Sequence, residues 1–219
     1  MIDHKKASCT LGSLAAILLL AACGGGSDQQ QQQQQQQQMT PGQMPMQGQQ
    51  TQQQQAPGGA PHTMTDAPGG WKKVSIMGTS TTFEMPAPID AQQLPDGTLR
   101  YVYKPQGSKV SYTVGVSSRN LESDRKKGVT NEQALEIWTD QIIQANLMTF
   151  NQMKLNPKID LVGKFNVGNA QSIQYSGKVG KADVTYICYV TDLALYYLEV
   201  ITQNPQSPDV KRFIDSFRP

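Results

Sequence analysis

The chain has 219 residues, a formal net charge of +2 and only 16% charged residues, so it lacks the basic excess expected of a nucleic-acid-binding protein. All its aromatic residues, 2 Trp, 8 Tyr and 5 Phe, lie after residue 70. Only residues 71–219 can therefore bury a sizeable core, and this length suits one domain.

The first 22 residues have the pattern of a secretory signal peptide. Lys5 and Lys6 precede an apolar run over 7–20, and small residues follow it. The run is shorter than the roughly 20 apolar residues that a permanent membrane-spanning helix needs. The sequence therefore predicts a cleaved export signal over residues 1–22.

Leu20-Ala-Ala-Cys23, followed by Gly24, resembles the lipobox of bacterial lipoproteins. The resemblance implies cleavage before Cys23, a diacylglycerol on its thiol and often a further acyl chain such as palmitate on its amine. Several acyl chains, at about 0.8 kcal/mol per buried CH₂, hold a protein stably on a membrane. We expect a bacterial cell-envelope protein anchored at Cys23 and facing the periplasm. Gly24, where an Asp would favour the inner membrane, slightly favours the outer one. The alternative is an ordinary signal peptide with a cysteine there by chance.

Residues 23–70 are expected to form a tether. They contain ten consecutive Gln at 29–38, many Gly and Pro, and no aromatic residue. Such a composition cannot build a core and predicts disorder. We expect no stable secondary structure before Trp71; whether the length of the tether matters for function stays open.

From Trp71 onward the pattern alternates between strand and helix signals. Short apolar alternations predict strands near 71–77, 81–86, 99–103 and 110–116. A helix is expected from Asn131 to about Met153, capped by Thr130 or Asn131. One helical stripe supports it, formed by Ala134, Leu135, Trp138, Ile142 and Ala145.

Four further strands and a final helix are expected after this helix. The strands are placed near 159–165, 170–175, 182–191 and 193–202, and short connections between them favour antiparallel hairpins. The last two carry apolar residues on both faces, which places them in the middle of a sheet. Pro208 opens the helix. The expected fold is α+β, an antiparallel β-sheet sandwiched by helices.

This layout resembles the PsbP/Mog superfamily, which includes DcrB-like bacterial lipoproteins. The resemblance rests on the opening Phe83-Glu-Met-Pro86, a long helix after the first strands, a Tyr-rich hairpin and the ending 210–217. It implies a PsbP-like domain that acts as a binding or accessory module, because members of the superfamily are mainly photosystem subunits, small-GTPase partners and envelope lipoproteins.

The residues offer little for catalysis. The two histidines are His4, in the export signal, and His62, expected in the tether, so no Ser-His-Asp triad, Cys-His pair or His metal site is expected. Cys188 is expected to be a buried, inert thiol. Four tyrosines are expected to fill the sheet faces rather than form a stacking platform: Tyr186, Tyr189, Tyr196 and Tyr197.

We therefore expect a non-catalytic binding domain, not an enzyme, without cofactor or metal and with an unidentified envelope partner. Two alternatives stay open. One is a hydrolase using a carboxylate pair, Glu84 with Asp90 or Glu122 with Asp124. The other is a periplasmic carrier with a closed apolar cavity for a small ligand.

Residues 119–128 are expected to form an exposed loop and are the candidate docking site. The loop combines four basic residues with two acidic ones, and exposed loops tend to collect binding residues. The alternative is a solvated connector whose charges only aid solubility. The candidate partner-binding residues are Arg119, Arg125, Lys126 and Lys127.

Overall fold

The computed structural model describes residues 61–219. The predicted signal peptide, Cys23 and the Gln-rich part of the tether lie outside these residues. The folded domain begins earlier than expected, because β1 (His62–Ala67) lies in the predicted tether. This strand pairs antiparallel with β2 (Trp71–Ile76), from His62 opposite Ile76 to Ala67 opposite Trp71. The expectation of no secondary structure before Trp71 is wrong for this segment, because pairing with β2 orders it.

Two antiparallel sheets make up the domain. The smaller has the order β1-β2-β3, where β3 (Thr82–Pro86) pairs with β2. The larger has the order β4-β5-β6-β10-β9-β8-β7. Its strands are β4 (Asp90–Gln93), β5 (Leu99–Tyr103), β6 (Val110–Ser118), β7 (Lys158–Val167), β8 (Ala170–Val179), β9 (Ala182–Val190) and β10 (Ala194–Thr202). The expected strands are all present, and β1 and β4 are additional.

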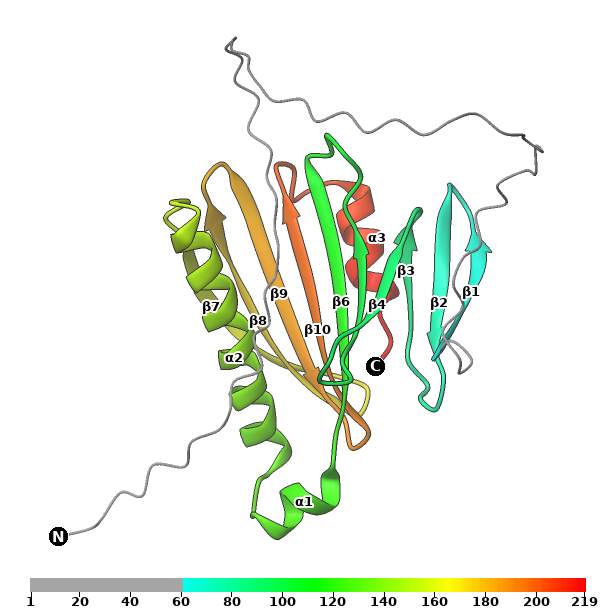
Figure 1. The fold of residues 1–219 in the computed structure, drawn as a ribbon, viewed down its shortest axis with the longest axis vertical. Helices are drawn as coiled ribbons and strands as arrows, with labels where there is room; N and C mark the ends of the chain where they lie inside the picture. The colour runs from blue at the N-terminus through cyan, green and yellow to red at the C-terminus, as the bar shows by residue number, and fades with distance from the viewer. Residues whose placement is uncertain (1–60) are drawn as a thin grey trace, which may run out of the picture. The chain divides into compact units, whose positions relative to one another are not determined.

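One face of the larger sheet is covered by the long helix α2 (Asn131–Gln152), as Figure 1 shows. The helix begins at the expected residue because Thr130 caps it: the Gln133 amide donates to the Thr130 hydroxyl, and the Gln133 side chain accepts from the Thr130 amide. It packs mainly on β8 and β9 and less on β10. The part of this face formed by β4, β5 and β6 lies beyond the main contacts of the helix.

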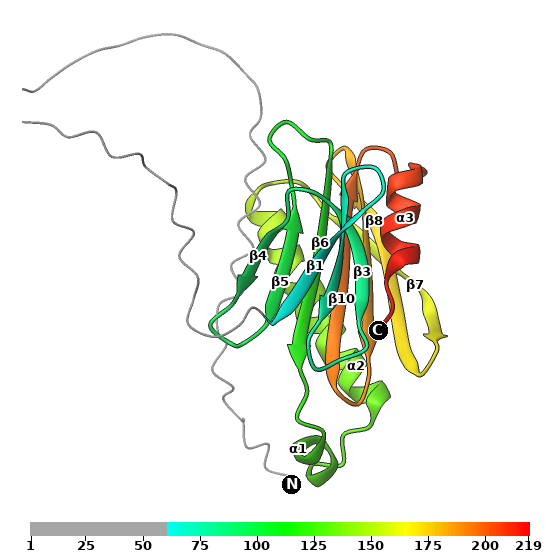
Figure 2. The same ribbon diagram turned by 90° about the vertical axis from the view of Figure 1, so that its right-hand side faces the viewer.

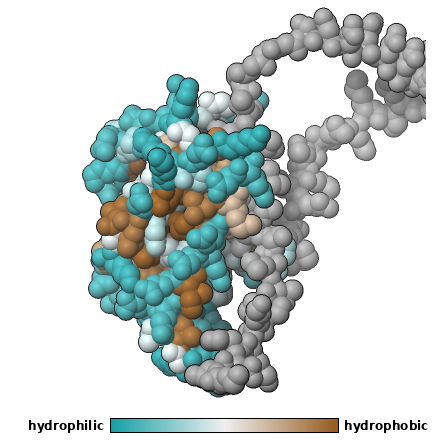
Figure 3. All heavy atoms as spheres, turned by 90° about the vertical axis from the view of Figure 1, so that its left-hand side faces the viewer, coloured by the Kyte–Doolittle hydropathy of each residue, from teal (hydrophilic) through white to brown (hydrophobic). Residues whose placement is uncertain are grey.

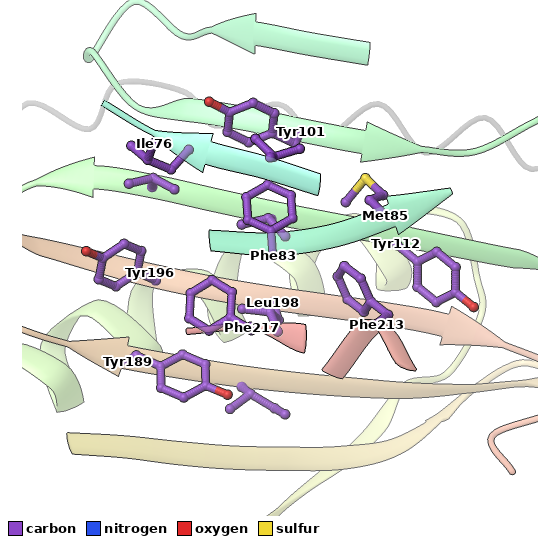
Figure 4. Close-up of a cluster of buried hydrophobic side chains, with 14 of the residues drawn as sticks. Ile76, Phe83, Met85, Tyr101, Tyr112, Tyr189, Tyr196, Leu198, Phe213 and Phe217 are labelled. Atoms are coloured by element: carbon purple, nitrogen blue, oxygen red, sulfur yellow. The ribbon is translucent and has the colours of Figure 1, made fainter. Parts of the chain in front are cut away.

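The opposite face packs against the small sheet and α3 (Pro208–Ser216), seen edge-on in Figure 2. The shared core is rich in aromatic rings; Phe217 lies 4.9 Å from Tyr189 and Phe213 lies 4.6 Å from Tyr112, between ring centroids (Figure 4). The α+β class and the antiparallel sheet are as predicted. The expectation of helices on both faces is only partly right, because the small sheet forms much of the second layer.

Candidate functional site

The predicted docking loop contains a short helix, α1 (Leu121–Lys126). Asn120 caps its start by accepting from the Ser123 amide at 2.9 Å. Its basic residues Arg125, Lys126 and Lys127 are exposed, and Lys126 forms an ion pair with Glu122 at 2.7 Å. These three residues stay the predicted docking residues, now placed at one end of a helix instead of on an irregular loop.

Arg119 differs from the other candidates because its side chain is only 2% exposed. Its Nε donates to Asp124 at 2.7 Å, and its Nη1 donates to the Asn131 side chain at 2.7 Å and to the Thr191 carbonyl at 3.0 Å. Arg119 therefore ties α1, the start of α2 and the β9–β10 turn together. Its assignment to a docking surface is wrong, because its guanidinium is used within the fold.

Three of the four carboxylates proposed for hydrolysis form ion pairs with separate cations. Glu84 forms an ion pair with Arg212 at 2.6 Å, whereas Asp90 lies exposed on β4. Asp124 is bound by Arg119. Glu122 is likewise paired with Lys126 at 2.7 Å.

Cys188 is buried and His62 is partly buried, both in structural positions. Burial raises the pKa of Cys188 to about 12, which agrees with an inert thiol. His62, expected in the tether, belongs to β1 and lies edge-on to Tyr101, with 5.1 Å between ring centroids. Burial lowers the pKa of His62. Within residues 61–219, no group of three His, Cys, Asp or Glu side chains is placed to hold a metal ion.

The unexpected feature of the domain is Glu199, a carboxylate in the middle of the central strand β10. Only 5% of the residue is exposed, and it lies on the face that carries α2. Its neighbours across the sheet are Thr113 on β6 and Tyr186 on β9, both buried. The strand was expected to be apolar on both faces, and the single Glu within it was the sequence signal for a buried polar site.

Burial raises the pKa of the Glu199 carboxyl above its ordinary value. The charge of Arg100, the nearby hydroxyls of Tyr186 and Thr113 and the charge of Lys104 oppose this shift without cancelling it. The Thr113 hydroxyl donates to the carboxyl at 3.3 Å, a long contact. Glu199 is therefore a buried acid whose ionised form is only weakly stabilised by its neighbours.

A row of side chains leads from α2 to β5 beside Glu199. The Trp138 ring of α2 lies 6.4 Å from the Tyr197 ring, measured between centroids. The Tyr197 ring lies over Gly115, where an added Cβ would meet its Cε1 atom at 1.8 Å. Gly115 is in turn the strand partner of Arg100. Glycine at this position leaves the room in which the Tyr197 ring lies across the sheet toward β5.

Three hydrogen-bond donors of this region are buried and have no partner among the described residues. They are the Nε of Arg100, the Nε1 of Trp138 and the hydroxyl of Tyr186, which faces Glu199 without a well-formed hydrogen bond. We call Arg100, Thr113, Trp138, Tyr186, Tyr197 and Glu199 the Glu199 cluster. Buried donors without a partner are uncommon in folded proteins and require an explanation.

A second surface feature lies on the opposite face, beside α3. A groove of about 450 Å³ is lined by Phe165, Val167, Gln174, Ile187, Tyr189, Ile214, Asp215, Phe217 and Arg218. On the neighbouring edge strand β7, Leu161, Val162 and Phe165 are 53%, 59% and 39% exposed. Figure 3 shows apolar side chains gathered on the side of the domain where β7 and α2 lie. Nothing in the groove indicates the chemistry of an occupant.

No family model matches the chain, and no curated protein matches it in sequence. Among solved structures, the chain is similar to the solution structure of cyanobacterial PsbP (CyanoP) from Synechocystis sp. PCC 6803. The two share 12% sequence identity with a TM-score of 0.46, over 75% of this chain and 98% of that one. A similarity at this level does not indicate a function for this chain.

Proposed function

We propose that the chain is a bacterial envelope lipoprotein, anchored through Cys23, whose folded domain binds an envelope component without catalysing a reaction. The observation that carries the proposal is the order of the segments. A lipobox ending at Cys23 comes first, a Gln-rich stretch follows, and a domain with its own core begins near Pro61. In this arrangement the anchor fixes the protein to the membrane and the Gln-rich stretch serves as the tether.

The described domain has features that suit a role beyond anchoring. It presents exposed cations on α1 and a buried polar cluster around Glu199. Between residues 61 and 219, no helix is long and apolar enough to cross a bilayer. In the proposed arrangement, the lipid on Cys23 attaches the protein to the membrane and the domain lies on the periplasmic side.

Substitution of the anchor cysteine tests this proposal. Cys23→Ala removes the thiol that carries the lipid, so the protein is expected to leave the membrane fraction and appear in the soluble fraction. Cys9→Ala is the matched control, because Cys9 lies within the predicted signal and is lost with it. If the Cys23→Ala chain is exported and still sediments with membranes, the anchor proposal is wrong.

A further inference from the structure

The outer edge of β7 is the longest free strand edge in residues 61–219. β7 lies at the end of the seven-stranded sheet, and within these residues it pairs with β8 alone. None of its ten residues is fully buried. The strand at the other end of the sheet, β4, has only four residues and no large apolar side chain. A free edge presents unpaired N–H and C=O groups that can take another strand.

A β-bulge divides this edge into two halves. It leaves Val162 without a partner on β8, and bulges of this kind protect strand edges from pairing. The half before the bulge carries Lys158 and Asp160 and follows a proline. The half after it, residues 163–167, contains no proline and keeps a continuous register with β8. Regular pairing with a further strand is therefore expected only along 163–167.

The charge in this second half is already neutralised within the chain. Lys164 forms ion pairs with Glu132 at 2.9 Å and with Glu136 at 2.6 Å, which hold its ammonium against α2. Phe165, the next residue, is 39% exposed and lines the groove beside α3 on the opposite face of the sheet. An exposed aromatic ring thus lies on a free strand edge with no unpaired charge next to it.

We propose that residues 163–167 of β7 pair antiparallel with the same residues of a second copy of this chain. The two seven-stranded sheets then join edge to edge across a two-fold axis at Phe165. The free backbone groups fit an extended polypeptide strand, and a two-fold axis is the commonest symmetry of soluble oligomers. The inference concerns the folded domain and does not depend on the anchor at Cys23.

The register centred on Phe165 is the one in which all five residues are paired. Phe165 lies opposite the partner's Phe165, Lys164 opposite the partner's Asn166, and Gly163 opposite the partner's Val167. Both Phe165 rings lie on the same face of the joined sheet, where an aromatic cross-strand pair is stabilising. A register centred on Lys164 would instead place two lysines opposite each other, which is unfavourable. The side-chain pattern of the segment therefore fits a copy of itself.

The oligomeric state of the unlipidated protein tests the proposal. We would use residues 24–219, which lack the predicted signal and Cys23 but keep the Gln-rich stretch and the domain. A contact of five residue pairs is small, so the dimer is expected to be weak. Sedimentation equilibrium at concentrations up to about 0.3 mM should show a reversible monomer–dimer equilibrium.

Substitution of Phe165 tests where the contact lies. Phe165→Lys is expected to weaken self-association about tenfold or more, because it removes the ring pair and places two positive charges opposite each other. Met77→Lys is the matched control, since Met77 is 63% exposed in the turn after β2, in the small sheet. This control should associate as the wild type does. The melting temperature of both variants should stay near the wild-type value, because both side chains are exposed.

Crosslinking tests the register. Residues 24–219 contain a single cysteine, the buried Cys188, so an added surface cysteine reports on its own position. Phe165→Cys should give a disulfide-linked dimer under mild oxidation, because side chains directly opposite in antiparallel strands are about 5 Å apart at Cβ. Lys158→Cys is the control. Its two copies lie on opposite sides of the axis, about 45 Å apart at about 3.3 Å per residue, and should not crosslink.

Three results would overturn the proposal. The first is a chain that sediments as a monomer at every concentration. The second is equal self-association of Phe165→Lys and Met77→Lys, which would place the contact away from β7. The third is disulfide formation by Lys158→Cys as fast as by Phe165→Cys, which would exclude the register centred on Phe165.

Discussion

At the scale of single residues, Glu199 shows how one polar side chain changes the character of a core strand. Tyr197, Leu198, Val200 and Ile201 around it are all buried and mostly apolar. A buried carboxylate is unfavourable when ionised, and the raised pKa of Glu199 expresses that cost. Such a residue is retained in a core only at some loss of stability.

Glu199→Gln is expected to stabilise the domain at neutral pH. The folded state holds the Glu199 proton more tightly than the unfolded state, so this contribution is fully present below the ordinary pKa of 4.5 and is lost as pH rises through the raised folded value. A neutral Gln avoids that loss, so its melting temperature should exceed the wild-type value near pH 7, and the difference should vanish below about pH 4. Each kcal/mol corresponds to about 2–4 °C for a domain of this size.

Glu122→Gln provides the control for this measurement. The Glu122 side chain is 79% exposed, and exposed ion pairs contribute little, so its melting curve should follow the wild type at every pH. A Glu199→Gln chain that melts below the wild type at pH 7 would show that the ionised carboxylate is better compensated than its surroundings indicate.

Gly115→Ala tests the close approach of the Tyr197 ring. An added Cβ would lie 1.8 Å from the ring carbon Cε1, so the ring or the strand must move. Overpacking of this kind costs about 1–3 kcal/mol, measured by denaturant unfolding. Gly163→Ala is the matched control, since nothing lies within 4 Å of its added Cβ. Equal stability of the two variants would contradict the described position of Tyr197.

At the scale of elements, long periodic segments were predicted well and short ones were not. Helix α2 and strands β8, β9 and β10 follow their apolar patterns because each buries a broad surface. The short helix α1 has no buried residue and depends on the Asn120 cap and on Arg119, which the local sequence does not reveal. The sequence does not predict strand β1, because none of its side chains is fully buried and the segment is ordered by pairing with β2.

Arg119→Ala is expected to destabilise the domain through these elements. The change removes a buried guanidinium and leaves Asp124 and the Thr191 carbonyl without their donor. We expect a loss of about 2–3 kcal/mol in the free energy of unfolding. Arg125→Ala, on the exposed side of α1, should change it by less than about 0.5 kcal/mol. If both variants unfold at the same denaturant concentration, Arg119 has no structural role.

For a similar reason, the sequence does not predict that the residues of the Glu199 cluster lie together. Its members come from β5, β6, α2, β9 and β10, and only strand register brings them to one face. The lone Glu within an apolar run was the available signal. The unpaired donors of Arg100 and Trp138 have no sequence signature, because their state depends on what surrounds them in the fold.

At the scale of the whole molecule, the boundary of the folded domain can be tested by truncation. A chain of residues 61–219 keeps β1, while a chain of residues 71–219 loses the strand and the contact of His62 with Tyr101. The shorter chain is expected to melt about 5–10 °C lower, for a loss of about 2–3 kcal/mol. The longer one should melt with the full chain. If both truncated chains have the same melting temperature, the folded domain begins at Trp71 and β1 does not contribute to its stability.

The proposed role of the protein depends most on what is attached to Cys23. The decisive measurement is the intact mass of the N-terminal peptide of the protein purified from membranes. We expect a peptide that begins at Cys23 and carries a diacylglycerol, with or without an amide-linked acyl chain. A peptide that begins elsewhere, or an unmodified Cys23, would contradict the proposal of a lipid-anchored envelope protein.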